Sequence, residues 1–179
     1  MAAEPLNGPL PWRLRRLPVC ASTELELDRW LRRLDAEATL QRSGLVVIAR
    51  RQRHGRGRLG RRWISPAGGL WLSAAFRWPV AAAGQGAPLT LAAALGLALQ
   101  LEAVGLRPQI KWPNDLLLDG RKLAGILPRL RLAGGRVRWA QVGLGLNGIN
   151  RVPAGAIGVG EALQRGRPKR HGAARFDPR

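Results

Sequence analysis

Residues 111–127 read KWPNDLLLDGRKLAGIL, and the Asp119-Gly120 pair at their centre is the strongest local signal for structure in the chain. An Asp-Gly pair between two apolar segments favours a two-residue turn, because both turn positions adopt positive φ. We therefore predict a β-hairpin whose strands cover residues 116–118 and 122–127. This hairpin places antiparallel strands at the centre of the fold.

More strands are predicted on both sides of this hairpin. The Gly134-Gly135 pair separates residues 129–132 from residues 136–144, and both segments are strand-like. Upstream, residues 109–112 are predicted to form another short strand. Short turns join strands that run antiparallel, so this half of the chain predicts an antiparallel sheet.

The N-terminal half mixes helices and strands. A capping-box pattern at Thr23 and Glu26, followed by apolar residues at helical spacing, predicts a helix over residues 24–41. The other predicted elements are a buried strand over residues 45–49, a long basic loop over residues 50–68, a period-two strand over residues 69–77 and a core helix from Thr90 to residue 104. Together they predict an α+β fold with a mixed, mostly antiparallel sheet and helices on one face.

Length and composition indicate one globular domain of 179 residues. We expect an extended leader over residues 1–19, a folded domain over residues 20–162 and a basic, disordered tail over residues 163–179. The N-terminus lacks a signal-peptide core, and the apolar run over residues 91–99 is too short for a bilayer, so we expect a cytoplasmic protein without a membrane contact. The single Cys20 excludes a disulfide framework, and two separated histidines show no metal-ligand spacing.

The charge is strongly basic, with 30 Lys and Arg residues against 11 Asp and Glu residues and a net charge of +19. Such an excess fits a surface that binds polyanions. It also fits a coding bias toward arginine, because only Lys111, Lys122 and Lys169 are lysines. Both interpretations remain open from composition alone.

Three segments carry residues suited to chemistry. Residues 50–63 (RRQRHGRGRLGRRW) combine arginines with glycines that let a backbone approach an anion closely. Residues 142–150 (VGLGLNGIN) leave room for a flat ligand against a strand. The hairpin segment gathers polar groups that could hold a carboxylate and a magnesium-bound nucleotide: Lys111, Asn114, Asp115 and Lys122. Taken singly, each segment also fits a structural role, as a solvated or RNA-binding loop, a solvated hairpin or a glycine-rich strand end.

Together these motifs resemble the catalytic core of biotin protein ligases, a class II synthetase-like fold. The matching stretches are GRGRLGRRW (55–63), KWPND (111–115), RKLAGIL (121–127) and GLGLN (143–147), and the resemblance covers about residues 20–162. It implies an ATP-dependent reaction in two steps. The biotin carboxylate attacks the α-phosphate of ATP to give biotinyl-5'-AMP, and a lysine of the biotin carboxyl carrier protein of acetyl-CoA carboxylase then accepts the biotinyl group.

The resemblance also implies which residues act. The expected catalytic residues are Lys122, which touches the biotin carboxyl group, and Arg58, which closes over the adenylate. The expected biotin-binding residues are Ser22, Thr23, Gln52, Gly55, Arg56, Gly57, Arg58 and Lys122. The expected nucleotide-binding residues are Arg58, Arg61, Trp63, Asn114, Asp115 and Asn147. ATP and Mg2+ are the implied cofactors, with magnesium near Asp115 and no metal held by protein ligands alone.

Departures from the family pattern are also visible. Glu24 stands where the family often has asparagine, and Pro128-Arg129 stand where it often has an acidic residue. The predicted basic tail replaces the usual further helices and small C-terminal β-barrel. No helix-turn-helix precedes the core, so specific DNA binding is not expected. A lipoate- or octanoate-type ligase, a non-catalytic basic nucleic-acid-binding module and a homodimer all remain open.

Overall fold

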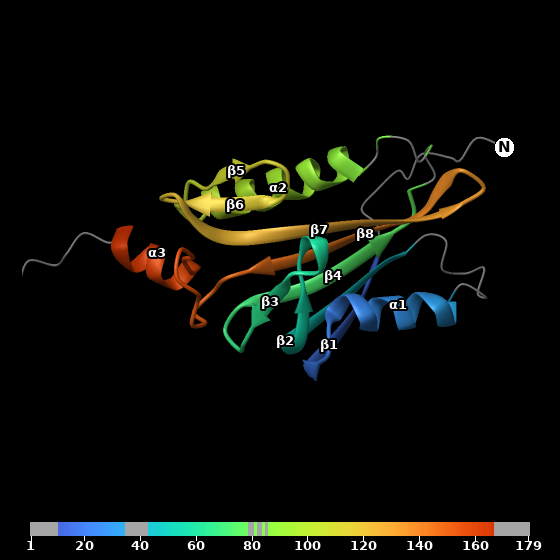
Figure 1. Ribbon diagram of the computed structural model, residues 1–179, viewed down its shortest axis with the longest axis horizontal. Helices are drawn as coiled ribbons and strands as arrows, with labels where there is room; N and C mark the ends of the chain where they lie inside the picture. The colour runs from blue at the N-terminus through green and yellow to red at the C-terminus, as the bar shows by residue number, and fades with distance from the viewer. Residues whose placement is uncertain (1–10, 35–42, 79–80, 82–83, 85, 167–179) are drawn as a thin grey trace, which may run out of the picture.

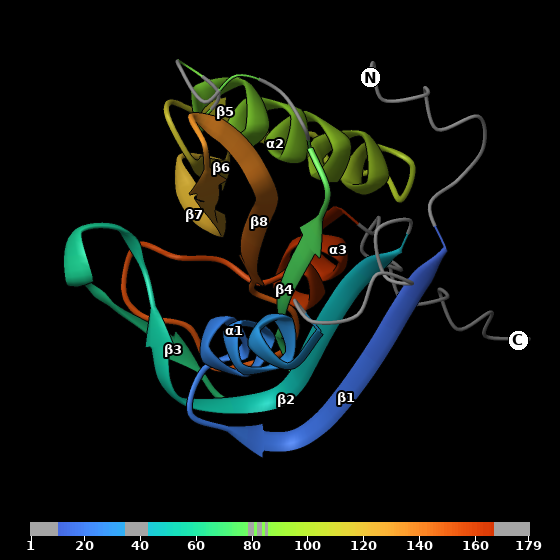
Figure 2. The same cartoon turned by 90° about the vertical axis from the view of Figure 1, so that its right-hand side faces the viewer.

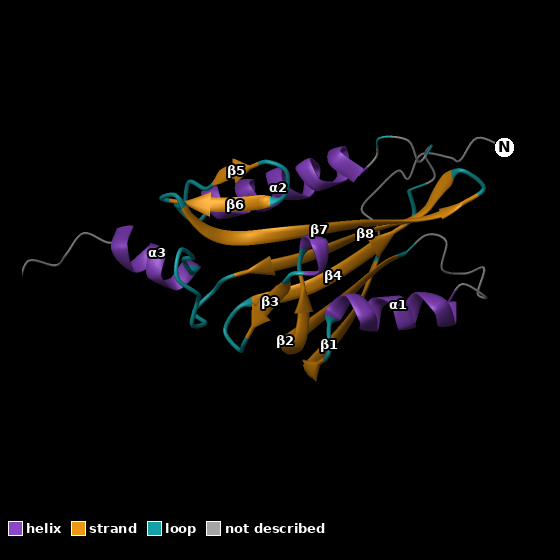
Figure 3. Cartoon of the chain, viewed as in Figure 1, coloured by secondary structure: helices purple, strands orange, loops and turns teal. Residues whose placement is uncertain are grey.

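The computed structural model describes residues 11–34, 43–78, 81, 84 and 86–166. Figures 1 and 3 show a twisted sheet with helices packed against it. The elements are, in order, β1 (Trp12–Cys20), α1 (Thr23–Leu34), β2 (Gly44–Arg56), the 3-10 helix η2 (Arg58–Gly60), β3 (Arg62–Ser65), β4 (Leu70–Phe76), α2 (Gly86–Glu102), β5 (Gln109–Lys111), β6 (Asp115–Leu118), β7 (Arg121–Ala133), β8 (Arg136–Leu146) and α3 (Val159–Gly166). No helix in this described part is long and apolar enough to cross a lipid bilayer.

The described strands form one sheet of eight strands. Its order is β1-β2-β4-β8-β7-β6-β5, and β3 pairs with the C-terminal end of β2. The strands β1 and β2 are parallel because α1 forms the crossover between them, whereas the other pairings are antiparallel. The predicted mixed, mostly antiparallel sheet is confirmed.

Both predicted two-residue turns are present. Asp119 and Gly120 have φ of 50° and 71°, and Gly134 and Gly135 have φ of 56° and 71°. Positive φ at both central positions is the geometry that matches the right-handed twist of a hairpin. The turns join β6 to β7 and β7 to β8, so they fix the register of the strands that carry the third and fourth family motifs.

The helices α1 and α2 lie on opposite faces of the sheet, which corrects the expectation of helices on one face. On β8, Trp139 packs with Leu27 and Leu31 of α1, whereas its neighbour Ala140 packs with Leu89 of α2. Successive side chains of a strand point to opposite faces, so the two helices cover different sides (Figure 2). Apolar periodicity identifies the buried side of a helix, but it does not say which face of the sheet that side covers.

The helix α1 is held by the apolar stripe that the sequence predicts. Leu27 and Leu31 are fully buried against Leu45 and Val47 of β2. Burying each of these leucines stabilises the fold by about 2 kcal/mol. The described helix ends at Leu34, and the remainder of the predicted helix, to residue 41, lies outside the described residues.

Two segments predicted to be irregular are regular structure. Residues 12–19, the end of the predicted extended leader, belong to β1 and pair with β2, and residues 50–68, assigned to a long loop, contain the end of β2, η2 and β3. The alternation that marks a strand is weak in both segments, because they lie at the edge of the sheet and carry exposed arginines on both sides.

Two boundaries also differ from the prediction. The helix α2 begins at Gly86, and the Thr90 hydroxyl donates to the Gly86 carbonyl at 2.7 Å from inside the first turn rather than capping it. At the other end of the chain, α3 runs to Gly166 and buries Ala162 beside Leu101 of α2. The first residues of the predicted tail are therefore helical, and residues 167–179 lie outside the described residues.

Candidate active site

A cavity of about 490 Å³ lies between the N-terminus of α1, the strands β7 and β8, the loop of residues 153–156 and residues 52–65, which we call the flap. In Figure 2 the flap projects from the body of the sheet next to α1. Lys122 and Arg58, which come from distant parts of the sequence, both line this cavity. The other predicted site residues that line it are Ser22, Thr23, Gln52, Arg56, Gly57, Arg61, Trp63, Asn114, Asp115 and Asn147.

Lys111 of the predicted hairpin cluster does not line the cavity, and neither does Gly55, which was predicted to bind biotin. A Cβ atom at this position would lie 2.5 Å from the Trp63 carbonyl oxygen and 2.5 Å from Ser65 Oγ. The glycine is therefore needed for close packing of the two strands of the flap. Contact with a ligand is not required to explain it.

One end of the cavity carries a network of uncharged hydrogen-bonding groups. The side-chain oxygen Oε1 of Gln52 accepts from the Thr23 backbone N–H at 2.8 Å and from the Thr23 hydroxyl at 3.0 Å. Thr23 Oγ1 also lies 2.9 Å from Ser73 Oγ, and Gln52 Nε2 donates to Ser65 Oγ at 2.8 Å. Ser22 is fully buried beside this network. The arrangement presents fixed donors and acceptors suited to a neutral polar ring.

Ser73 was not predicted as part of this network. It is a buried polar residue on β4, whose other residues are all apolar. A serine on the inner side of a buried strand needs a hydrogen-bond partner, and that requirement is the signal that could have identified it. The Thr23 hydroxyl, predicted to cap α1, instead bonds across the sheet to Gln52 and Ser73.

The opposite part of the cavity is charged. Lys122 Nζ lies 2.7 Å from Asp115 Oδ2 and 5.0 Å from the centroid of the Trp63 ring. Asp115 Oδ1 is buried and has no hydrogen-bond partner. Among the described residues, no group of three or more His, Cys, Asp and Glu side chains could hold a metal ion. A metal here would need ligands from the substrate as well as Asp115.

Trp63 of the flap rests on the glycines of β7 and β8. A Cβ on Gly145 would lie 2.5 Å from Trp63 Nε1, and a Cβ on Gly125 would lie 2.9 Å from the Trp63 ring. Gly145 belongs to the segment of residues 142–150, which the sequence analysis expected to leave room for a flat ligand, whereas no such role was predicted for Gly125. In this structure the flat group that both glycines accommodate is an indole, whose buried Nε1 has no hydrogen-bond partner.

Arginine and asparagine side chains join the flap to the sheet. Arg58 Nη1 donates to Asn114 Oδ1 at 3.2 Å, and Asn114 Nδ2 donates to the Ile126 carbonyl at 3.1 Å. On the neighbouring strand end, Asn147 Nδ2 donates to the Lys122 carbonyl at 3.3 Å. These contacts place Arg58 over the cavity and fix the backbone that carries Lys122.

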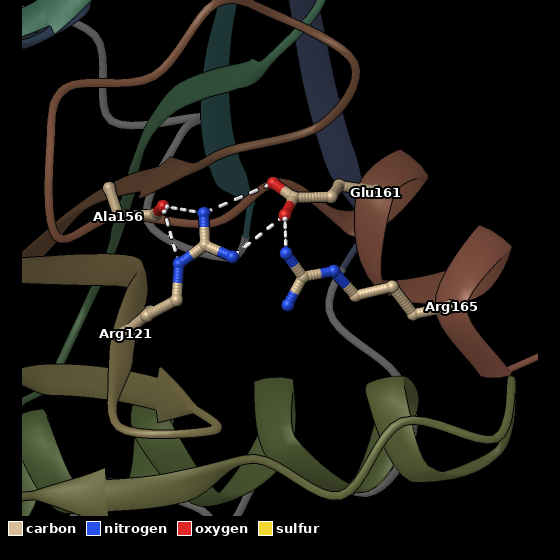
Figure 4. Close-up of polar contacts among 4 residues, drawn as sticks. All are labelled: Arg121, Ala156, Glu161 and Arg165. Carbon is tan, nitrogen blue, oxygen red and sulfur yellow. Dashed lines mark hydrogen bonds and ion pairs between the residues drawn. The ribbon is translucent and has the colours of Figure 1, made fainter.

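The loop of residues 153–156 is a wall of the cavity that the sequence did not predict. Arg121 Nη2 donates to the Ala156 carbonyl at 2.6 Å, and Arg121 Nη1 lies 2.7 Å from Glu161 Oε1 of α3 (Figure 4). Arg165 also contacts Glu161 at 2.7 Å. The hydrogen bond from Arg121 lowers the pKa of Glu161 from its ordinary value, and the same bond raises the pKa of Arg121. Arg121 therefore anchors the loop beside Lys122.

Two residues that depart from the family pattern meet at the back of the cavity. Arg129 Nη1 lies 3.2 Å from Glu24 Oε1 and 2.7 Å from Asp28 Oδ2. Gln141 Nε2 donates to Asp28 Oδ1 at 3.2 Å. These contacts tie the first turns of α1, next to Ser22, to β7 and β8. Glu24 is acidic and Arg129 is basic. The opposite charges of these two departures are visible in the sequence and are compatible with the contact that the structure shows.

The profile of the biotin/lipoate A/B protein ligase family matches residues 26–147 of the chain. This match includes the flap, both hairpin motifs and the glycine-rich end of β8. The chain belongs to the biotin/lipoate A/B protein ligase family. Membership explains why motifs far apart in the sequence converge on one cavity.

Individual relatives show which proteins of the family the chain resembles, and they include a biotin ligase. The chain is 40% identical to the bifunctional ligase/repressor BirA of Bacillus subtilis over 112 residues, which are 62% of this chain and 34% of that protein. It is 42% identical to the biotin--[acetyl-CoA-carboxylase] ligase of Paracoccus denitrificans over 120 residues, 64% of this chain and 48% of that protein. The chain thus spans between about a third and a half of these relatives.

A solved structure gives the same result for the fold. The biotin protein ligase of Aquifex aeolicus in complex with biotin and ATP superposes with a TM-score of 0.59 and 29% identity, covering 84% of this chain and 61% of that one. The expected α+β class with a mixed, mostly antiparallel sheet and the resemblance to biotin protein ligases are therefore confirmed.

Proposed function

We propose that the chain is an ATP-dependent ligase that activates biotin as biotinyl-5'-AMP and transfers it to a lysine of the biotin carboxyl carrier protein of acetyl-CoA carboxylase. The observation that carries this proposal is the single cavity that unites a neutral hydrogen-bonding end with Lys122 and Arg58. Family membership supports the same chemistry. The catalytic unit of the proposal starts at β1 and includes α3, so it is longer at both ends than residues 20–162.

The charged end supplies what the first step needs. A biotin carboxylate and the α-phosphate of ATP repel each other, so the attack requires fixed cations nearby. In the proposed roles Lys122 contacts the biotin carboxyl group, and Arg58 neutralises charge on the phosphate as pyrophosphate leaves. Arg56 and Arg61 line the same cavity and extend its positive lining toward the nucleotide.

The neutral end suits the ureido ring of biotin, which has two N–H donors and one carbonyl acceptor. Ser22, Thr23 and Gln52 offer complementary groups there, and their mutual hydrogen bonds hold them in place. A dithiolane or alkyl chain, as in lipoate or octanoate, offers no hydrogen bond to the remaining donor and acceptor positions of these groups, and a buried polar position left without a partner costs about 1–3 kcal/mol. The network therefore favours biotin over the other acids of the family.

The flap provides the proposed protection of the anhydride. Closure of Arg58 and Trp63 over bound adenylate would exclude water until the ε-amine of the acceptor lysine attacks the carbonyl carbon and AMP leaves. Asn114 and Asn147 are the proposed partners of the nucleotide side. We place this activity in the cytoplasm, where both ATP and the acceptor protein are available.

Magnesium fits this site through one protein group. Asp115 Oδ1 is buried without a partner, and a carboxylate oxygen of this kind suits Mg2+, which commonly takes its other ligands from phosphates and water. When bound, the ion would neutralise phosphate charge. The side chains of Lys122 and Arg58 would still have to position the reacting carboxylate and phosphate.

Transfer of biotin to a purified carrier domain tests the proposal. With ATP, magnesium and biotin, the chain should biotinylate the carrier, and Lys122→Ala should lower the rate by at least about a hundredfold. Octanoate and lipoate should compete poorly. An inactive wild-type chain beside an active full-length relative, or faster transfer of lipoate than of biotin, would contradict the proposal.

A further inference from the structure

A second hollow lies on the flap, outside the ligand cavity. It measures about 340 Å³, and the residues that line it alone are Arg51, Arg53, His54, Ser65 and Pro66. It shares Gln52, Arg62, Trp63 and Ile64 with the ligand cavity, so one flap separates the two spaces. We call this hollow the basic groove.

The cations of the basic groove are not neutralised within the described protein. Arg51, Arg53 and Arg62 are exposed, and none of them forms an ion pair with a carboxylate of the described residues. Within the described residues, the side chains of these arginines make one hydrogen bond, from Arg62 Nη2 to the Arg53 carbonyl at 3.5 Å. Three arginines held together without a counter-charge repel one another, and an anionic partner would relieve that repulsion.

The proposed reaction does not use two of these arginines. The triphosphate would meet the cations that line the ligand cavity, among them Arg56, Arg58 and Arg61. Arg51 and Arg53 line only the basic groove, so the chemistry of adenylation does not explain them. Another anionic partner therefore fits these positions.

The chemistry of the basic groove favours a protein as that partner. Ile64 is 56% exposed between the arginines, and Pro66 adds a second apolar surface. An apolar centre surrounded by charged residues is typical of protein–protein interfaces. A phosphate backbone would gain little from the isoleucine, and no exposed Phe, Tyr or Trp of the described residues lines the groove to stack with bases; the exposed ring there is the imidazole of His54.

We propose that the basic groove is the surface on which the acceptor protein docks, through a face that carries carboxylates around an apolar contact. This inference rests on the proposed function. Because Trp63 and Gln52 belong to both spaces, a protein bound in the groove would have its target lysine beside the cavity that holds the acyl-adenylate. Electrostatic attraction would then act mainly on the rate of encounter.

The test separates the two steps of the reaction. The double variant Arg51→Gln/Arg53→Gln should form biotinyl-5'-AMP at the wild-type rate, whereas its kcat/KM for the carrier domain should fall by about tenfold at low salt. The difference should shrink as salt rises, because exposed charges are screened. Arg32→Gln/Arg33→Gln, which removes the same charge from the exposed last turn of α1, is the control and should change neither step.

Each of the other outcomes overturns either the docking surface or the proposed function. Unchanged carrier kinetics in the double variant, or an equal loss in the α1 control, would overturn the docking surface while leaving the proposed function intact. Absence of adenylate in the wild-type chain would instead remove the proposed function. Loss of binding to a single-stranded RNA oligonucleotide, with carrier kinetics unchanged, would assign the groove to nucleic acid and overturn the inference.

Discussion

At the scale of single residues, two glycines of the same strand differ in how much space the structure leaves for a side chain. Gly143 and Gly145 are both in β8 and both line the cavity, but they differ in the space above them. A Cβ on Gly145 would lie 2.5 Å from Trp63 Nε1, whereas the nearest atom to a Cβ on Gly143 is Leu127 Cβ at 3.4 Å. The two positions therefore form a matched pair.

Gly145→Ala should displace Trp63 and impair ligand binding, whereas Gly143→Ala should have a small effect. The added methyl group cannot move away, because β8 is hydrogen-bonded on both sides by β4 and β7. We expect the Kd for biotin with ATP to rise at least about tenfold for Gly145→Ala, equivalent to about 1.4 kcal/mol. Tryptophan fluorescence and calorimetry would measure it, and equal behaviour of the two variants would contradict the packing argument.

Arg129 supports a second residue-scale prediction. It is the one cation among the described residues that contacts both Glu24 and Asp28, and Asp28 is buried. Arg129→Met should leave two nearby carboxylates without a counter-charge and lower the free energy of unfolding by about 1–3 kcal/mol. It should also raise the KM for biotin more than it lowers kcat, because α1 begins at Thr23 and directly follows Ser22.

A second substitution tests whether the loss of stability in Arg129→Met comes from this ion pair or from general damage to the core. Adding Glu24→Gln to Arg129→Met removes one of the two unpaired carboxylates and should restore part of the lost stability. Denaturant unfolding of the wild type, both single variants and the double variant gives the coupling. Additive losses would show that Glu24 and Arg129 do not interact.

At the scale of elements, the contact between α3 and β7 should depend on pH. The pKa of Glu161 is lowered in the folded protein, so its pairing with Arg121 stabilises the fold above the ordinary pKa of about 4.5 and is lost as pH falls through the lowered value. We expect Tm to fall on acidification partly through this contact. Glu161→Gln should reduce the wild-type stability at neutral pH and flatten its dependence on acid pH. A wild-type slope retained in the variant would exclude this cause.

The elements also show what the sequence can predict. The turns at Asp119-Gly120 and Gly134-Gly135 follow from local chemistry, so the hairpins of β6, β7 and β8 were predicted with little error. The strand β1 and the flap were missed, because edge strands with exposed arginines lack apolar alternation. The face that each helix covers was also missed, since it depends on how the whole chain crosses the sheet.

The structure brings most of the residues named from the motifs to one cavity, and their roles there are proposals. Each of the four recognised motifs contributes residues to the lining of the cavity, although not every motif residue faces it, and the predicted Gly55 and Lys111 do not. What the sequence did not reveal are the supporting contacts. Ser73, the loop of residues 153–156 and the Arg129 pairing come from segments without a motif, and only the tertiary fold brings them to the cavity.

At the scale of the whole molecule, the excess of positive charge has two separate uses in our account. Arginines that face the ligand cavity are assigned to phosphate, and those of the basic groove are assigned to the acceptor protein. The polyanion-binding interpretation of the composition is thereby limited to one face of the flap. The single buried cysteine takes no part, because burial and the nearby Glu26 raise the pKa of Cys20 to about 11 and keep it a thiol at neutral pH.

Formation of biotinyl-5'-AMP by the purified chain is the most direct measurement of whether the cavity joins biotin to ATP. With both substrates and magnesium, mass spectrometry should detect protein-bound biotinyl-5'-AMP in the wild type, and Lys122→Ala should form it at least about a hundredfold more slowly. The account would be contradicted if biotin did not accelerate pyrophosphate release by this chain while a full-length relative was active in the same assay.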